Sequence, residues 1–447
     1  MTLPADGRRY LARRMERALD RGVARGGPDG PRPRSFWVGV GAVVAAAAAA
    51  GAAALSTLRP GGDAGDSRIL MDRDSGALYV RVEDTLHPVL NLTSAHLLTG
   101  HGGGPRAVRS DALAPFERGP TLGIPGAPAQ IGAGLDGEAA TWAVCDGPRT
   151  VVLVGTPAPP DPLDGGEAVF VTGPSGTTHL LYAATRAVVD VADPGVSRAL
   201  RFDRAEPVPV SAGLLNLLPE APPLVTPRIP GAGNPGPGQL SGLRVGDVVS
   251  IERSSGAEYF VVLEGGVQPV SGVAADLIRA AGATAERVTP TLSPDVLSAV
   301  PIVGTLAVAS YPDRVEVSRQ GERWVCVHWA AGRVTITTAG ALPLPQGRAS
   351  IRLARADGAG HALDEVSLPP GRSLYVRAER GPGGGALITD TGVRFAVDAD
   401  AAGLLGLPEH PMPAPWPLVA ALPEGPELSR AAASVQRDVP TAATPHG

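Results

Sequence analysis

The chain has 447 residues, of which 44% are hydrophobic and only 4% aromatic, so it can form several modest hydrophobic cores rather than one large core. Its 58 glycines and 46 prolines favour loops and short strands. The formal net charge of −5 argues against nucleic acid as a partner, because phosphate binding requires clustered positive charge. All 39 basic residues are arginine, which excludes a Schiff-base lysine and the lysine of a phosphate-binding loop.

The first 35 residues are basic and precede an uncharged apolar segment, residues 36–58. At about 1.5 Å per residue this segment is long enough to span a bilayer, and Phe36 and Trp37 stand at its start, where aromatic side chains prefer the interface. The basic side of a span stays in the cytoplasm. We therefore predict a cytoplasmic segment over 1–35, a single transmembrane helix in contact with membrane lipid, and an exported remainder. A cleaved signal peptide and a buried soluble helix are the alternatives. The arginines of the basic segment are Arg8, Arg9, Arg13, Arg14, Arg17, Arg21, Arg25, Arg32 and Arg34.

A pattern of strand, turn and helix recurs along the exported portion. YVRVEDTLHPV (79–89) matches FVVLEGGVQPV (260–270), and a helix-like stretch follows each. LITDTGVRFAV (387–397) is a third copy, and residues 179–200 form a weaker one with Thr185 and Arg186 at its turn. Each copy is typical of a β-hairpin closed by a short helix. Because such a unit is too small to hold much core, the units should pack on each other or on a central domain.

Two cysteines lie between these units, Cys145 in TWAVCD and Cys326 in RWVCVHW. In an exported protein such a pair favours a structural disulfide, which would close a loop of about 180 residues. Two free buried thiols are the alternative, and a metal site is disfavoured because neither cysteine has CxxC or HxxxH spacing. His328 lies beside Trp329 in the same strand pattern and is interpreted as a packed residue rather than a ligand.

Together these patterns predict an α+β chain. It has an N-terminal transmembrane helix and then a multi-domain exported portion with four small βα repeat domains and, if Cys145 and Cys326 are bonded, a central β-rich, disulfide-bonded domain built from distant parts of the chain. The predicted repeat units are unit 1 (66–120), unit 2 (166–205), unit 3 (241–290) and unit 4 (379–412). The segments between them are assigned to the central β domain: a first segment (121–165), a further segment with an exposed Pro-rich linker (206–240) and a last segment (291–378). The C-terminal segment (413–447) is expected to pack on the central domain and to end in a tail.

The order of these motifs resembles the EccB family, the single-pass membrane component of the type VII (ESX) secretion systems of actinobacteria. The resemblance covers nearly the whole chain. It is carried by the basic start before one membrane helix and by LYVRVEDTLHPVLNLTSAHLL, LGIPGAPAQI, WAVCD, WVCVHW, LITDTGVRFAV and PWPLVAALPEGPELS in the family's order.

This resemblance implies four periplasmic repeat domains around a β domain pinned by one disulfide. It also implies a homodimer within a larger assembly that contains the motor ATPase EccC, EccD and EccE in the membrane, and the mycosin protease outside. The repeats are similar to cell-wall-binding modules of phage lysins, which makes peptidoglycan a further expected partner.

Members of this family have been labelled ATPases, but the sequence offers no enzyme site. GxxxxGK[ST] cannot occur without lysine, and the Gly-rich segments 100–104 and 381–385 are interpreted as flexible turns. No GxSxG accompanies HGGG (101–104), and the eight histidines form no HExxH. We therefore predict no catalytic, cofactor-binding or metal-binding residue, and no cofactor. The expected function is a structural subunit that scaffolds the periplasmic side of a secretion channel. The alternative is a peptidoglycan-binding repeat protein, which the scarcity of aromatic residues disfavours.

Overall fold

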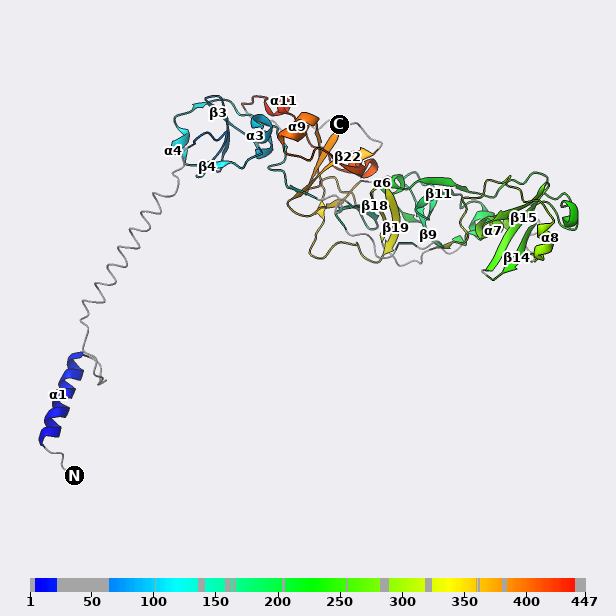
Figure 1. Cartoon of the computed structure of the whole chain (residues 1–447), viewed down its shortest axis with the longest axis horizontal. Coiled ribbons are helices and arrows are strands. Elements are labelled where there is room, and N and C mark those ends of the chain that lie inside the picture. The colour runs from blue at the N-terminus through cyan, green and yellow to red at the C-terminus, as the bar shows by residue number, and fades with distance from the viewer. Residues whose placement is uncertain are drawn as a thin grey trace. The chain divides into compact units, whose positions relative to one another are not determined.

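The structure is a computed structural model that describes residues 5–21, 64–100, 102–135, 141–156, 162–163, 166–202, 206–254, 256–281, 289–317, 324–358, 360, 362–379 and 384–438. The chain divides into two compact units, Met1–Asp63 and Ala64–Gly447 (Figure 1). In the first unit the described element is α1 (Ala5–Arg21), which holds six of the nine N-terminal arginines. Among the described ranges no helix is both apolar and long enough to cross a membrane, and the predicted span, residues 36–58, lies outside them.

Four modules in the second unit share one architecture, in which three antiparallel strands lead into a short helix. Module 1 comprises β1 (Ile69–Asp72), β2 (Leu78–Val82), β3 (Thr85–Pro88) and α3 (Leu92–Thr99). Module 2 comprises β9 (Glu167–Thr172), β10 (Thr178–Tyr182), β11 (Thr185–Val189) and α5 (Pro194–Ala199). Module 3 comprises β14 (Val248–Arg253), β15 (Gly256–Leu263), β16 (Gly266–Val270) and α7 (Gly272–Ala281). Module 4 comprises β22 (Arg372–Glu379), β23 (Gly385–Thr389), β24 (Arg394–Val397) and α9 (Ala399–Leu404).

Shorter elements extend the sheets of modules 1 and 2. The strands β4 (Arg106–Val108) and β5 (Glu117–Arg118) border module 1, and α4 (Ser110–Leu113) lies between them in the chain. Module 2 is extended by β12 (Val208–Pro209), β13 (Glu220–Leu224) and β17 (Glu316–Val317), with α6 (Ala212–Leu217) between β12 and β13 in the chain.

Modules 3 and 4 have similar additions. Module 3 is accompanied by the 3-10 helix η3 (Gly238–Leu240) and by α8 (Pro294–Ser298). Module 4 is extended by β6 (Ala133–Gly134) and β25 (Met412–Pro415), and α10 (Trp416–Ala421) and α11 (Arg430–Ala433) follow β25.

Each module helix begins where a polar side chain caps its first turn. Asn91 Oδ1 accepts a hydrogen bond from Ser94 N at 2.8 Å, and Asp398 Oδ1 accepts one from Ala401 N at 2.6 Å. Such a cap satisfies a backbone N–H group that the helix itself leaves unpaired. Asp193 and Ser271 cap α5 and α7 in the same way. The strand, turn and helix pattern therefore ends each time with its own helix-start signal.

The turn of module 2 lies two residues earlier than the sequence indicated. Ala183 and Ala184 form it with φ angles of 43° and 58°, and Thr185 and Arg186 already belong to β11. Alanine seldom adopts positive φ, because its Cβ crowds the backbone. The turn therefore carries none of the glycine, aspartate or asparagine that marks such turns in a sequence.

The modules pack in two pairs. A core cluster joins module 2 to module 3, with Val196 of α5 and Leu277 of α7 among its buried residues. Another cluster joins Leu97 of α3 to Leu387 of module 4 and to Ala402 of α9. Because each module covers some of its neighbour's helix, neither member of a pair has to bury its apolar face alone.

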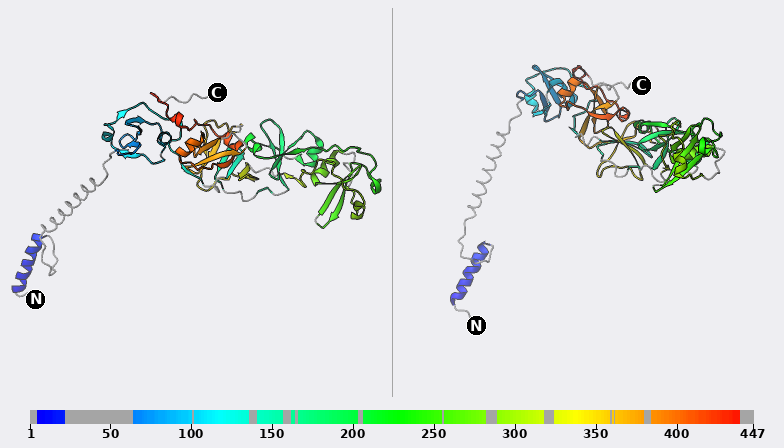
Figure 2. Two further views of the ribbon diagram at one scale, coloured as in Figure 1. Left: turned by 45° about the horizontal axis from the view of Figure 1, so that its top comes forward. Right: turned by 45° about the vertical axis from the view of Figure 1, so that its right-hand side comes forward.

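The C-terminal segment fastens module 4 to module 1. After α10 it bridges to β24, then enters α11, where Arg430 Nε donates to Leu97 O at 3.1 Å. Gly123 N donates to Ala433 O at 2.9 Å. Figure 2 shows the red end of the ribbon at the edge of the blue module 1, where α11 contacts α3. The predicted C-terminal segment thus holds two modules together.

Residues 219–238 are the Pro-rich part of the segment 206–240, which was predicted to contain an exposed linker, and they do not form a linker throughout. The strand β13 pairs in parallel with β11, and Leu224 is fully buried in the core shared by modules 2 and 3. A repeated sequence motif already indicates that the start of this segment is not a linker. LPEAPPL (218–224) recurs as LPEGPEL (422–428), and both copies run beside the third strand of their module.

Gly266, at the start of β16, shows where a module tolerates no side chain. Its φ is 154°, and a Cβ atom there would collide with the backbone carbonyl of Pro301. We expect Gly266→Ala to lower the free energy of unfolding by about 1–3 kcal/mol in urea titrations monitored by circular dichroism. Gly265→Ala is the matched control, since a Cβ there meets only Val303 at 3.8 Å. Equal stability of the two variants would refute this interpretation of β16.

Candidate functional site

The centre of the second unit is a six-stranded sheet in the order β19-β18-β7-β8-β21-β20. Its strands come from two distant regions of the chain, as the sequence predicts. They are β7 (Trp142–Asp146), β8 (Thr150–Val154), β18 (Trp324–Ala330), β19 (Arg333–Ala339), β20 (Ile351–Arg352) and β21 (Glu365–Ser367).

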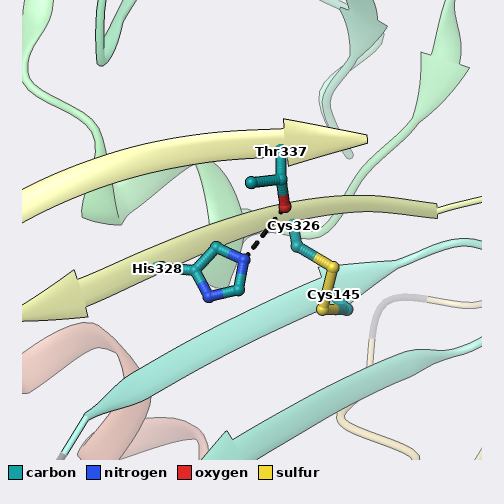
Figure 3. Close-up of a disulfide and its surroundings, with 4 residues drawn as sticks. All are labelled: Cys145, Cys326, His328 and Thr337. Atoms are coloured by element: carbon teal, nitrogen blue, oxygen red, sulfur yellow. Dashed lines mark hydrogen bonds between the residues drawn. A yellow bond between two sulfur atoms is a disulfide. The ribbon is translucent and has the colours of Figure 1, made fainter. Parts of the chain in front are cut away.

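The structure joins the two predicted cysteines at the middle of this sheet. Cys145 on β7 lies directly opposite Cys326 on β18, and their Sγ atoms are bonded at 2.04 Å (Figure 3). Both residues are fully buried. Because the partners are 181 residues apart, the bond fastens the first half of the unit Ala64–Gly447 to the second half.

The two faces of the central sheet are covered differently. On one face, Trp142, Val144 and Val327 belong to the largest core cluster, into which α6 and α10 also pack. On the other face, Cys145, Cys326 and Trp324 form a small cluster, against which Leu342 and Leu344 of an irregular segment pack. The disulfide therefore lies beneath a thin covering.

His328 lies on the disulfide face, two residues after Cys326. Its Nε2 is 3.0 Å from Thr337 Oγ1 of β19, and the ring is 9% exposed (Figure 3). Burial lowers the pKa of His328 from 6.5 to about 4, because the charged ring would lose its hydration. It is thus a packed, neutral residue, in keeping with its interpretation from the sequence.

Asp146 is a buried carboxylate that the sequence analysis missed. It ends β7 on the helix-covered face, and its Oδ2 accepts a hydrogen bond from Ser211 N at 2.6 Å, at the start of α6. Burial raises the pKa of Asp146, and the nearby charge of Asp364 adds to that rise. Asp364 in turn accepts from Thr150 N at 2.8 Å. These contacts tie α6 and β21 to the central hairpin.

The two halves of the unit Ala64–Gly447 repeat each other around this centre. In each half a strand pair follows one module and precedes another, and the two pairs meet at the disulfide. The LPE motifs reinforce the correspondence. Arg186 pairs with Glu220 at 3.3 Å in module 2, and Arg394 pairs with Glu424 at 2.8 Å in module 4. The helices before them, α6 and α10, pack into the same core.

The other residues noted from the sequence do not meet at one place. Gly100 ends α3 with a φ of 67°, which fits a turn, whereas residues 380–383 lie outside the described ranges. Across the described ranges no group of three or more His, Cys, Asp or Glu side chains is placed to hold a metal ion.

A family model described as "Type VII secretion system ESX-1, transport TM domain B", for EccB, matches residues 4–441. The chain belongs to the EccB family. It is 35% identical to the ESX-3 secretion system ATPase EccB3 of Mycolicibacterium smegmatis, over 97% of this chain and 90% of the relative. It is also 35% identical to the ESX-2 secretion system ATPase EccB2 of Mycobacterium tuberculosis, over 97% of this chain and 94% of that protein.

Solved structures agree with the family assignment. This EccB chain superposes on a chain of an intact ESX-5 inner membrane complex with a TM-score of 0.74 at 32% identity, covering 100% of this chain and 98% of that one. It superposes on the EccB3 dimer from the ESX-3 core complex with a TM-score of 0.71 at 35% identity, covering 83% and 100%. As an EccB protein it is a structural subunit of a type VII secretion complex.

Proposed function

We propose that this EccB protein anchors the complex in the membrane through residues 36–58 and scaffolds its periplasmic side with the four modules. The observation that carries the proposal is the superposition on a chain of an intact ESX-5 inner membrane complex over the full length of this chain. A second neighbour is a periplasmic assembly from the ESX-5 inner membrane complex, which covers 88% of this chain with a TM-score of 0.73. The arginines before residue 36 support a cytoplasmic N-terminus.

The structure of the exported portion suits a scaffold. Modules 1 and 4 share one core and modules 2 and 3 share another, and the disulfide-bonded sheet connects the two halves of the chain. Rigid bodies with shared cores transmit force and hold spacing, as a frame around a channel requires. The proposal includes the division into repeat domains around this centre. Unit 4, however, begins with β22 at Arg372 and not at residue 379 as the sequence indicated, because β22 pairs with β23 of module 4 rather than with the central sheet.

We also propose that the chain does not hydrolyse ATP, although its relatives carry ATPase in their names. The argument is chemical, because a phosphate loop of the form GxxxxGK[ST] uses its lysine to reach the β and γ phosphates. The whole sequence contains no lysine. In the assembly we expect the ATP-driven work to belong to EccC.

As partners we propose a second copy of this chain, EccC, EccD, EccE and the mycosin protease. The dimer is supported by the EccB3 dimer among the structural neighbours, and the others rest on the family resemblance. Binding to peptidoglycan stays a prediction, which sedimentation of the purified protein with cell-wall sacculi would test.

Co-purification from gently solubilised membranes tests this function. We expect a tagged chain to bring down the other subunits in a complex far larger than a dimer, with no ATP hydrolysis by the chain alone. Replacing Arg8, Arg9, Arg13 and Arg14 by Glu should weaken recovery of the cytoplasmic partners. The control is glutamate at four exported arginines, Arg73, Arg109, Arg253 and Arg333.

Two outcomes would refute elements of the proposal. A tagged chain that elutes alone from intact membranes would oppose the scaffold. Magnesium-dependent ATP hydrolysis that follows the purified chain through successive columns would oppose the non-enzymatic role.

A further inference from the structure

The segment between β19 and β20, residues 340–350, covers the disulfide, and we call it the strap. Leu342 and Leu344 are its partly buried apolar residues, and they pack on the cluster that contains Cys145, Cys326 and Trp324. On the opposite face, α6 packs on β7 and β18 within a much larger core. The disulfide is therefore covered on the strap side by a much smaller apolar cluster than the one that covers the helix side.

The backbone of the strap is held loosely. Leu344 N donates to Leu342 O and Arg348 N donates to Pro345 O, both within the strap. In the portion of the chain that the structure describes, no backbone-to-backbone hydrogen bond joins residues 340–350 to another segment. A segment that shares no backbone hydrogen bonds with its neighbours can detach while the sheet beneath it stays intact.

Side chains at the end of the strap supply the anchors. Arg348 Nη1 donates to Val154 O at 2.8 Å, and Arg348 Nη2 donates to Gly155 O at 2.9 Å. These are the last carbonyl of β8 and the one after it. Ser367 Oγ donates to Ala349 O at 3.2 Å, and Ser350 Oγ bonds Glu365. The two bonds from the Arg348 guanidinium and the bond from Ser350 to the Glu365 carboxylate are charge-assisted, and Arg348 is the residue that makes two of them.

We infer that the strap is a latch-controlled cover for the disulfide, with Arg348 as the latch, and that its opening lets a dithiol reach Cys145–Cys326 while the core stays folded. The bond can then be exchanged in place. One thiolate of the dithiol attacks a sulfur of the bond, and the other cysteine leaves as a thiolate and takes up a proton. The second thiol of the reductant loses its proton and attacks the mixed disulfide, so that the reductant closes its own S–S bond and the second protein cysteine leaves as a thiolate and takes up a proton. Two electrons pass to the protein, and the reductant ends as a disulfide.

The test is the rate at which dithiothreitol reduces the full-length protein in detergent, followed by labelling the freed thiols with a maleimide that shifts the band on a gel. The disulfide of the Arg348→Gln variant should be reduced at least about tenfold faster than that of the original protein, because the variant loses two charge-assisted hydrogen bonds. Arg352→Gln is the control, since Arg352 is an exposed arginine four residues on. Its rate should match that of the original protein.

Low concentrations of urea separate strap opening from global unfolding. Local opening exposes little surface, so the reduction rate should stay nearly constant well below the unfolding midpoint. A reduction rate that rises with urea in step with the unfolding equilibrium would overturn the inference, even if Arg348→Gln were itself less stable. Equal rates for Arg348→Gln and Arg352→Gln would also overturn it.

Discussion

Reduction of the Cys145–Cys326 bond is expected to lower the free energy of unfolding by about 2–4 kcal/mol. The bond closes a loop with a sequence separation of 181 residues. The chain-entropy model gives up to about 5 kcal/mol for such a loop, and measured values are usually smaller. The affected region should be the interface between β7 and β18, because the bond joins the two halves there. Urea titration of the purified protein, with and without prior reduction, measures the difference.

Comparing the oxidised and the reduced original protein isolates the effect of the bond, because the reduced protein lacks the bond but keeps both sulfur atoms in the core. A Cys145→Ala and Cys326→Ala double variant should be less stable than the reduced protein, since it also leaves a void between fully buried strands. Coincident transitions for the oxidised and reduced protein would show that the sheet holds its two halves without the bond.

Acidification from pH 7 to pH 4 is expected to remove about 3 kcal/mol of stability through His328 alone. The folded state holds the pKa of this ring at about 4, against an ordinary value of 6.5. Between these values the unfolded chain binds a proton that the folded chain does not. The contribution is therefore complete above pH 6.5 and is lost as the pH falls toward 4.

His328→Gln isolates this effect, because glutamine can still bond Thr337 but does not titrate in this range. The stability difference between the original protein and the variant should shrink by about 3 kcal/mol between pH 7 and pH 4. Using a difference is necessary, because the raised pKa of Asp146 acts in the opposite sense. Its contribution is present at low pH and is lost as the pH rises. A constant difference across the range would mean that the His328 ring is protonated without penalty.

Much of the fold could be predicted from the sequence because its signals are local. Alternating strands, turn residues and capping side chains such as Asn91 and Asp398 lie within a few residues of each other. The cysteine pair could be anticipated because export was expected from the sequence, and two cysteines in strands of an exported protein usually form a disulfide. Module 2 was the weakest prediction, because Ala183 and Ala184 make its turn without any turn-forming residue.

The remainder depends on contacts between distant residues. Nothing near Asp146 in the sequence indicates that it meets Ser211, 65 residues later. The strap likewise resembles an ordinary loop until Arg348 is seen to reach β8, 194 residues earlier in the chain. The duplicated LPE motif was present in the sequence, and it indicates that residues 218–224 belong to a repeated structural element rather than to a linker.

Because Cys145 lies directly opposite Cys326, formation of the bond also selects the correct register between β7 and β18 during folding. A slip of one residue between β7 and β18 would send one sulfur to the helix side and leave the other under the strap, so the thiols could not meet. Oxidation thus favours the correct alignment and no other. A chain that misaligned its two halves would keep two free thiols and could still realign, whereas a correctly aligned chain is held in register by the bond.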